Sequence, residues 1–202
     1  RSFVELRDDV RALASEMLSM GCHGKHCALI GRFSYEWVVT YFATLSIGAV
    51  LVPLDRDWAA EDLADTVKKA DAAFLFTDED IAAKTAVIAK AVKLSEKPVF
   101  LQAKEEKNSL RALMDAGKAK FITHPERFFE ARISPDKLSL LVFTSGTTGK
   151  GKGVMLSQNN VLSDLCDVIP YIDFGKKTVG VLPPHHTYGS SVMLIGHMII
   201  GA

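Results

Sequence analysis

The sequence carries no charge excess, and this absence argues against nucleic acids and anionic membranes as partners. Its 202 residues include 24 lysines and arginines and 24 aspartates and glutamates, so the formal net charge is zero. Domains that bind nucleic acid or the surface of an anionic membrane usually carry basic residues in marked excess. We therefore expect no nucleic-acid partner and no polybasic membrane contact.

Cysteines and long apolar runs are also scarce. The chain has three cysteines and a hydrophobic content of 48%. An odd number of cysteines in a core-rich chain does not indicate a disulfide scaffold, and it favours a reducing compartment. The longest apolar stretch, residues 192–202, is shorter than the about 20 residues that a membrane-spanning helix needs, and His197 interrupts it. We expect a cytoplasmic protein without a membrane span.

The chain does have a regular alternation of apolar runs and amphipathic segments, without internal repeats. Strands are predicted at 27–30, 50–53, 72–76 and 99–101, and helices at 3–20, 35–47, 59–70 and 80–93. Ser34 is the predicted N-cap of the second helix, and Gly21 and Gly48 are predicted to end the first two helices. Strands that alternate with helices pair in parallel through crossovers. The prediction is an α/β fold whose mainly parallel sheet carries helices on both faces.

The second half of the chain is organised differently. Residues 104–137 are charged and contain one short helical pattern near 110–116, so we predict a surface excursion there. A buried strand at 138–143, a helix capped by Ser157 that ends near residue 169, a strand at 178–182, a turn and an apolar helix from Ser190 are predicted next. That last helix lacks a polar end and leaves surface for a partner. We therefore expect residues 1–202 to form an incomplete N-terminal domain whose C-terminal part is absent.

A loop rich in glycine and hydroxyl groups follows the strand predicted at 138–143. Residues 144–153 consist of four glycines, four serine or threonine residues and two lysines. Glycine lets a backbone approach a ligand closely, and successive exposed N–H groups form a concavity that binds anions. An ordinary surface turn does not need this concentration of hydroxyls, glycines and lysines together. The sequence therefore predicts a phosphate-binding loop at this strand end.

Two interpretations of the phosphate-binding loop remain open beside the one that a resemblance will suggest below. Gly146, Gly151 and Lys152 fit most of a Walker A motif, but Gly153 stands where that motif needs a serine or threonine for Mg²⁺. One alternative is therefore a P-loop-type nucleotide hydrolase. The other is a non-catalytic nucleotide-binding or interaction protein.

A possible metal cluster lies between the first predicted helix and the first predicted strand. Cys22, His23, His26 and Cys27 place four potential ligands within six residues. Zinc sites usually combine one closely spaced pair with ligands from elsewhere, and four adjacent ligands would strain one tight turn. We therefore expect no metal site here.

The loop also carries a resemblance to a known family. Residues 143–154, FTSGTTGKGKGV, resemble the phosphate-loop signature of the adenylate-forming superfamily of acyl-CoA synthetases, amino-acid-activating domains and luciferases. The further segments that resemble the family, in its own order, are 2–6, SYEWV at 34–38, LSIGAVLVPLD at 45–55, 154–161 and LPPHHTYG at 182–189. One departure is Gly151, which stands where the family usually has proline.

The resemblance implies an ATP-dependent, AMP-forming acid–thiol ligase of which this chain is the N-terminal part, inactive by itself. In the family, a carboxylate attacks the α-phosphorus of ATP, which gives an acyl-adenylate and pyrophosphate. A thiol of coenzyme A or of carrier-bound pantetheine then takes the acyl group. The implied ligands and partners are ATP, Mg²⁺ with its main ligand beyond residue 202, a small carboxylic acid, and coenzyme A or an acyl carrier protein.

The candidate site residues combine the loop chemistry with this resemblance. Lys152 is expected to stabilise the charge of the leaving pyrophosphate, and His186 is expected to lie beside the acyl and adenylate groups, with His185 as its neighbour. The residues expected to bind the phosphates are Thr144, Ser145, Gly146, Thr147, Thr148, Gly149, Lys150 and Lys152.

Overall fold

The computed structural model describes residues 1–103, 108–144, 151–172 and 182–201. Its strands are β1 (His26–Ile30), β2 (Val50–Leu54), β3 (Ala72–Thr77), β4 (Val99–Phe100), β5 (Leu138–Thr144) and β6 (Lys152–Ser157). Its longer helices are α1 (Phe3–Ser19), α2 (Tyr35–Ser46), α3 (Ala60–Lys69), α4 (Ala82–Ala91), α5 (Leu110–Thr123) and α7 (Gln158–Val168). The short helical segments are η1 (Glu79–Ile81), α6 (Glu126–Phe129), η2 (Ile169–Tyr171), α8 (Thr187–Ser190), η3 (Ser191–Gly196) and α9 (His197–Ile200).

The strands form one sheet in the order β4-β3-β1-β2-β5-β6. The pairings along this order are parallel from β4 to β5, and β6 alone runs antiparallel, against β5. In the central pair, Cys27 of β1 lies opposite Leu51 of β2. The predicted mainly parallel α/β sheet is confirmed.

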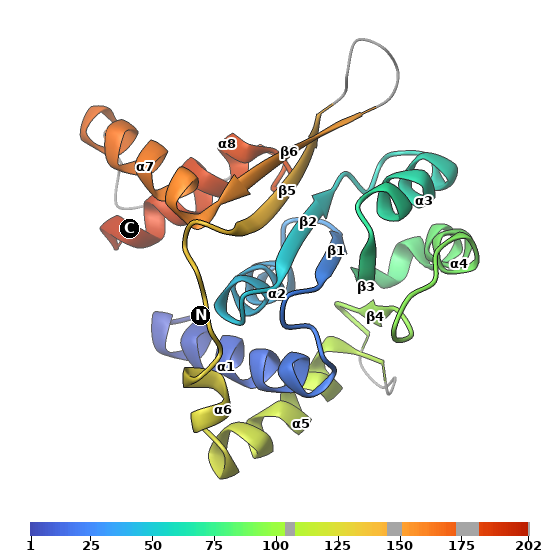
Figure 1. Cartoon of the computed structure of the whole chain (residues 1–202), viewed down its shortest axis with the longest axis horizontal. Helices are drawn as coiled ribbons and strands as arrows, with labels where there is room; N and C mark the ends of the chain where they lie inside the picture. Colours follow the sequence, from blue (N-terminus) through green and yellow to red (C-terminus); the bar gives the residue numbers. More distant parts are fainter. Residues whose placement is uncertain (104–107, 145–150, 173–181, 202) are drawn as a thin grey trace.

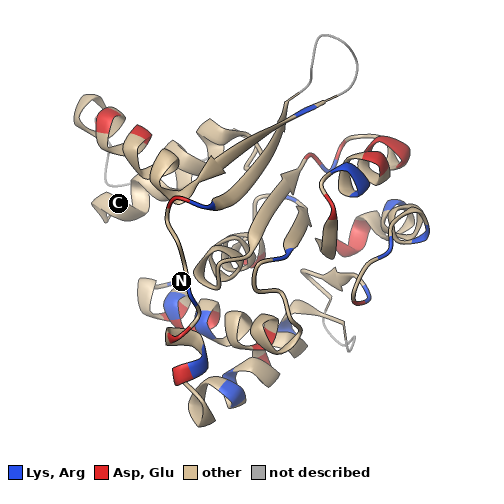
Figure 2. Ribbon diagram, in the orientation of Figure 1, with Lys and Arg blue, Asp and Glu red and all other residues tan. Residues whose placement is uncertain are grey.

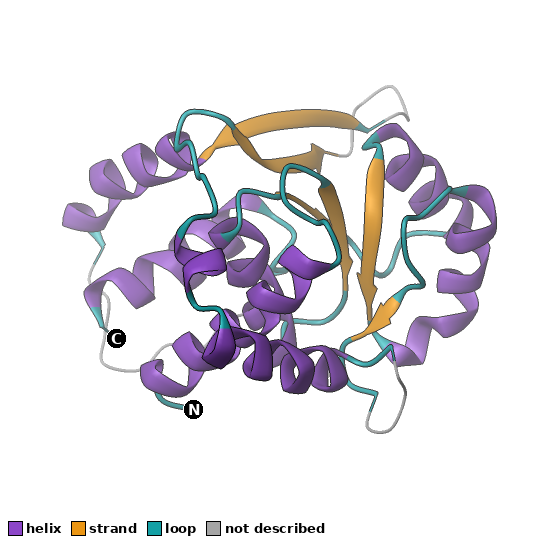
Figure 3. Ribbon diagram, turned by 60° about the horizontal axis from the view of Figure 1, so that its bottom comes forward, coloured by secondary structure: helices purple, strands orange, loops and turns teal. Residues whose placement is uncertain are grey.

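Helices cover both faces of the sheet, because side chains alternate between the faces along each strand. In β1, Cys27 and Leu29 contribute to the core shared with α1 and α2, whereas Ala28 and Ile30 contribute to the core shared with α3. Figures 1 and 3 show this layering, with α3 and α4 on the opposite side of the sheet from α1, α2 and α5. The predicted placement of helices on both faces is thus confirmed.

Local side chains fix the helix boundaries largely as predicted. Ser34 caps α2 by accepting a hydrogen bond from the backbone N–H of Trp37, and Ser157 forms a capping box at the start of α7. Gly21 and Gly48 follow α1 and α2 with φ of +82° and +69°, which favour glycine. These caps explain why the helix starts could be placed within a residue or two from the sequence alone.

Helix α5 extends well past the predicted pattern at 110–116, because it packs along α1. At Gly117 a Cβ atom would lie 1.9 Å from the carbonyl oxygen of Ala12, so the two backbones touch at this point. Most other side chains of 108–137 remain at least partly exposed. The division of the chain into an incomplete domain with a surface excursion stays a prediction.

Some predicted elements differ from the structure. The helix predicted at 80–93 divides into η1 and α4, and β6 and α6 were not predicted. The strand predicted at 178–182 lies outside the described residues except for Leu182. The apolar segment from Ser190 is helical, with a π-helical stretch at η3. Among the described residues, none of the helices combines the length and apolar character needed to cross a bilayer.

The close approach of α5 to α1 generates a stability prediction. We expect Gly117→Ala to lower the free energy of unfolding by about 1–3 kcal/mol, because the added methyl group forces the two backbones apart. Helix propensity alone would favour the alanine, so a loss isolates the packing effect. Chemical denaturation measures the change, and Ala116→Ser on the exposed side of α5 serves as the control. An unchanged or raised stability of Gly117→Ala would contradict this packing.

Candidate functional site

The predicted phosphate loop joins two antiparallel strands. Thr144, the last residue of β5, pairs with Lys152, the first residue of β6, so both lie at the loop end of a hairpin. Both side chains are exposed, and Figure 2 shows a basic residue at the start of β6. The remaining predicted phosphate ligands lie outside the described residues: Ser145, Gly146, Thr147, Thr148, Gly149 and Lys150.

This hairpin corrects one of the alternatives from the sequence. A Walker A loop leads from a strand directly into a helix, which supplies its N-terminus to the phosphates. Here β6 follows the loop, and Lys152 belongs to that strand. The interpretation as a P-loop-type hydrolase is therefore wrong in its structural context. The sequence hid β6 because most of its side chains are exposed and give no apolar alternation.

Two glycines make close contacts with β5 at the loop end of the hairpin. At Gly153 a Cβ atom would lie 3.0 Å from Leu141 Cδ1 and 3.4 Å from Phe143 Cζ, so its absence lets the Phe143 ring lie across β6. At Gly151 a Cβ atom would lie 3.1 Å from the carbonyl oxygen of Thr144. The departure from proline at this position therefore relieves a close contact between the two strands.

A lysine from a helix far away in the sequence contacts the same end of the hairpin. Lys69 Nζ, in the last turn of α3, donates a hydrogen bond of 2.6 Å to the carbonyl oxygen of Gly151. The ammonium also lies 5.8 Å from the centre of the Phe143 ring, in a cation–π contact. Lys69 could not be predicted from the sequence, because a contact across 82 positions leaves no local pattern.

A network of arginines and aspartates lies at the same edge of the sheet as the loop end of the hairpin. Parallel strands bring their carboxyl ends to one edge, where α/β proteins usually bind ligands. Asp78 follows β3 with a fully buried side chain, and its carboxylate accepts hydrogen bonds from the backbone of Arg32 and the guanidinium of Arg56. Arg32 and Arg56 also donate to Asp80, and the hydrogen bond from Arg56 lowers the pKa of Asp80. The network links the segments that follow β1, β2 and β3.

A histidine from the far end of the chain reaches this edge. His185 Nε2 lies 3.6 Å from Asp55 Oδ2, and the two side chains are 14% and 26% exposed. Burial is the main cause of a lowered pKa of His185, which the carboxylate of Asp55 partly opposes and the neighbouring His186 reinforces. The segments LSIGAVLVPLD and LPPHHTYG thus meet through this pair.

The histidine that was predicted to be catalytic is not His185 but its neighbour His186. His186 is exposed and stands at the N-cap of α8, and its ring centre lies 4.5 Å from that of His185. Among the described residues, no contact joins His186 to Lys152 or to Asp55. His185 was predicted only as a neighbour of His186, yet His185 is the residue that contacts Asp55 at the sheet edge.

The two histidines of the segment 22–27 contact backbone carbonyls, and its two cysteines contact each other. His23 Nδ1 lies 2.6 Å from the carbonyl oxygen of Ile47, and His26 Nδ1 lies 2.5 Å from that of Ala70. A hydrogen bond with Cys22 and burial raise the pKa of the Cys27 thiol, which disfavours the thiolate that a metal needs. No group of three potential metal-ligating side chains was found in the part of the chain that the structure describes. The expectation of no metal at this turn stays a prediction.

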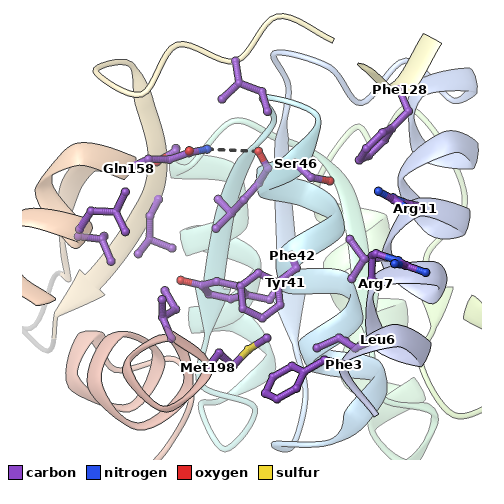
Figure 4. A pocket seen from close by; sticks show the side chains of 18 residues that line it. Phe3, Leu6, Arg7, Arg11, Tyr41, Phe42, Ser46, Phe128, Gln158 and Met198 are labelled. Carbon is purple, nitrogen blue, oxygen red and sulfur yellow. Dashed lines mark hydrogen bonds between the residues drawn. The ribbon is translucent and has the colours of Figure 1, made fainter. Parts of the chain in front are cut away.

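A large apolar cavity lies at the other end of the hairpin. Its volume is about 530 Å³, and α1, α2, α7 and α9 line it. Figure 4 shows Phe3, Tyr41 and Met198 around it, and Gln158 donates a hydrogen bond of 3.3 Å to the carbonyl oxygen of Leu45 there. The cavity reaches Leu140. At a rise of about 3.3 Å per residue, Leu140 lies about 13 Å along β5 from Thr144. The cavity is therefore separate from the carboxyl edge.

Comparison with known proteins gives a consistent result. The family described as AMP-binding enzyme matches residues 1–202. The long-chain-fatty-acid–CoA ligase FadD15 of Mycobacterium bovis is 27% identical over 195 residues, which are 94% of this chain and 32% of that protein. The phosphinothricin tripeptide synthetase PhsC of Streptomyces viridochromogenes is 29% identical over 166 residues, which are 79% of this chain and 13% of that protein.

Among solved structures, ATP-bound MatB from Rhodopseudomonas palustris is similar to this chain with a TM-score of 0.79 and 26% identity. The similarity covers 98% of this chain and 38% of that one. The chain therefore spans well under half the length of these relatives.

The burial of His185 generates a prediction about pH. Below about pH 6.5, the ordinary histidine pKa, the unfolded chain binds a proton that the folded chain does not yet bind. The free energy of unfolding therefore falls as the pH decreases toward the lower native pKa. We expect His185→Gln to make this decline shallower in denaturation series between about pH 5 and pH 7.5. The control is His124→Gln, at a side chain that is 64% exposed. An equal slope in His185→Gln and the unsubstituted protein would refute the assignment.

Proposed function

Because this chain belongs to the family of AMP-binding enzymes, we propose that it supplies the nucleotide-binding part of an ATP-dependent, AMP-forming acid–thiol ligase. The proposed reaction has two steps. A carboxylate attacks the α-phosphorus of ATP, and the bond from that phosphorus to the bridging oxygen breaks to release pyrophosphate. A thiol then attacks the acyl-adenylate and releases AMP.

The observation that carries this proposal is the position of the hairpin's loop end. Thr144 and Lys152 pair there, and this end lies at the edge where the parallel strands finish. The ten residues 144–153 supply hydroxyls, ammonium groups and glycine backbone, which match the chemistry of a polyphosphate. The similarity to FadD15 and to MatB supports the same assignment.

Each proposed residue has a defined task. The ammonium of Lys152 and the hydroxyl of Thr144 bind the β- and γ-phosphates and stabilise the charge that develops on the leaving pyrophosphate. His186 lies beside the acyl and adenylate groups, where an exposed imidazole is free to contact them. The further phosphate ligands of the proposal are Ser145, Gly146, Thr147, Thr148, Gly149 and Lys150.

ATP in such a reaction normally carries Mg²⁺, which neutralises phosphate charge. The described residues gather no group of three acidic, histidine or cysteine side chains for it. No step is therefore derived through the metal from this chain, and its main ligand is proposed to lie elsewhere in the natural protein.

The substrate and the acceptor are proposed at the level of class. FadD15 is named as a long-chain-fatty-acid–CoA ligase, and PhsC as a tripeptide synthetase. We favour a fatty or aromatic acid with coenzyme A over an amino acid with a carrier protein. The three cysteines are free thiols, which supports the proposed cytoplasmic setting.

The proposed function is tested by ATP–pyrophosphate exchange in the natural-length protein over a panel of carboxylic acids. We expect exchange that depends on the acid and releases pyrophosphate. Lys152→Met should lower kcat roughly 100- to 1000-fold, because one preorganised charge on the leaving group is lost.

The matched control is Lys137→Met, at an exposed lysine beside the opposite end of β5. This variant should retain the activity of the unsubstituted protein. Release of phosphate without dependence on an acid would contradict the ligase. Absence of exchange with every acid would favour a non-catalytic nucleotide-binding protein.

A further inference from the structure

The segment that follows β2 is held rigidly at the carboxyl edge of the sheet. The guanidinium of Arg56 bridges Asp78 and Asp80, with a distance of 2.8 Å to the latter. Lys84 Nζ, from α4, donates to the carbonyl oxygens of Arg56 and Trp58 at 2.9 and 2.8 Å. Side chains from beyond β3 therefore fix the backbone of residues 56–58.

This anchoring sets the direction of one carboxylate. Asp55 Oδ1 accepts a hydrogen bond of 2.9 Å from the backbone N–H of Asp57, so one oxygen is fixed by the rigid segment. The other oxygen, Oδ2, lies 3.6 Å from His185 Nε2. Asp55 therefore presents a preset oxygen to a residue 130 positions later in the chain.

The turn that carries His185 is compact, and Ser190 Oγ from α8 donates a hydrogen bond of 3.1 Å to the carbonyl oxygen of His186. The backbone N–H of His186 donates to the carbonyl oxygen of Pro183 at 3.1 Å. At Gly189 a Cβ atom would lie 2.3 Å from that same oxygen, so the backbone folds tightly on itself. The ring centres of His185 and His186 are 4.5 Å apart. The position of the His185 ring therefore restricts the space open to the His186 ring.

We propose that Asp55 is a positioning residue, which holds His185 at the sheet edge and through it sets the location of the neighbouring His186 ring. This inference rests on the proposed function, in which His186 contacts the acyl and adenylate groups. Asp55 itself touches neither ATP nor the acid in this account. Its loss should therefore affect the chemical step more than nucleotide binding.

The charges around His185 give the proposal a second readout. The charged or titratable groups that act on it are Asp55, Asp57 and His186. Asp55 favours the protonated imidazole, whereas burial and His186 disfavour it. Loss of the Asp55 carboxylate should therefore lower the pKa of His185 further, and the acid limb of the pH–rate profile should move to lower pH.

The experiment compares Asp55→Asn with Asp57→Asn in the natural-length protein. The substitution removes one carboxylate charge in each case, but the side chain of Asp57 is exposed and only its backbone contacts Asp55. For Asp55→Asn we expect kcat for acid-dependent pyrophosphate exchange to fall about 10- to 100-fold, because a misplaced group costs this much. The KM for ATP should stay within about twofold, because the phosphates bind at the hairpin.

A double-mutant cycle separates positioning from general instability. If Asp55 acts through His185, then the double variant should be impaired no more than His185→Asn alone. Asp55→Glu should restore part of kcat, because it returns a carboxylate to the same segment. NMR titration of the His185 ring should show its pKa lowered in Asp55→Asn and nearly unchanged in Asp57→Asn.

The outcomes distinguish this inference from the proposed function. If the unsubstituted protein catalyses no acid-dependent exchange, the proposed function fails and the inference falls with it. If it does catalyse exchange, equal kcat values for Asp55→Asn and Asp57→Asn would overturn the inference alone. Additive losses in the double variant, or a rise in the KM for ATP that accounts for the whole effect, would overturn it as well.

Discussion

The parallel alignment of β1, β2, β3 and β5 is the constraint on which the rest of the structure depends. Because these strands run in one direction, the segments that follow them meet at one edge of the sheet. Arg32, Asp55, Asp78 and Thr144 come together there from four distant parts of the chain. The antiparallel return of β6 then places Lys152 at the same edge. The hairpin that we propose to bind phosphate and the turn that carries His185 thus lie at the same edge of the sheet.

Charge is distributed unequally between the two ends of the sheet. At the carboxyl edge, the fully buried Asp78 is compensated by two arginines, and this network stiffens the segments around it. At the far end of β5, the cavity beside Leu140 is lined mainly by apolar side chains, with Arg7 and Arg11 among its polar residues. This apolar cavity and the proposed nucleotide site are therefore different places.

Much of the fold could be predicted from local patterns, and the contacts that organise the site could not. Alternating apolar runs and serine caps predicted the parallel sheet and most helix starts, because these signals lie within a few residues of each other. The exposed strand β6 gave no such alternation. The pairing of Asp55 with His185 joins positions far apart in the chain, so no local pattern could reveal it, and the resemblance pointed to His186 instead. The chemistry of the loop could be predicted from its residue types, but six of its residues lie outside the described part of the chain.

The central claim is that the loop end of the β5–β6 hairpin binds the phosphates of ATP. The most direct test is a crystal structure of the natural-length protein with a non-hydrolysable ATP analogue. Our account predicts the triphosphate at the hairpin, within hydrogen-bonding reach of Thr144 and Lys152. A triphosphate bound away from the carboxyl edge, for example in the apolar cavity beside Leu140, would contradict it.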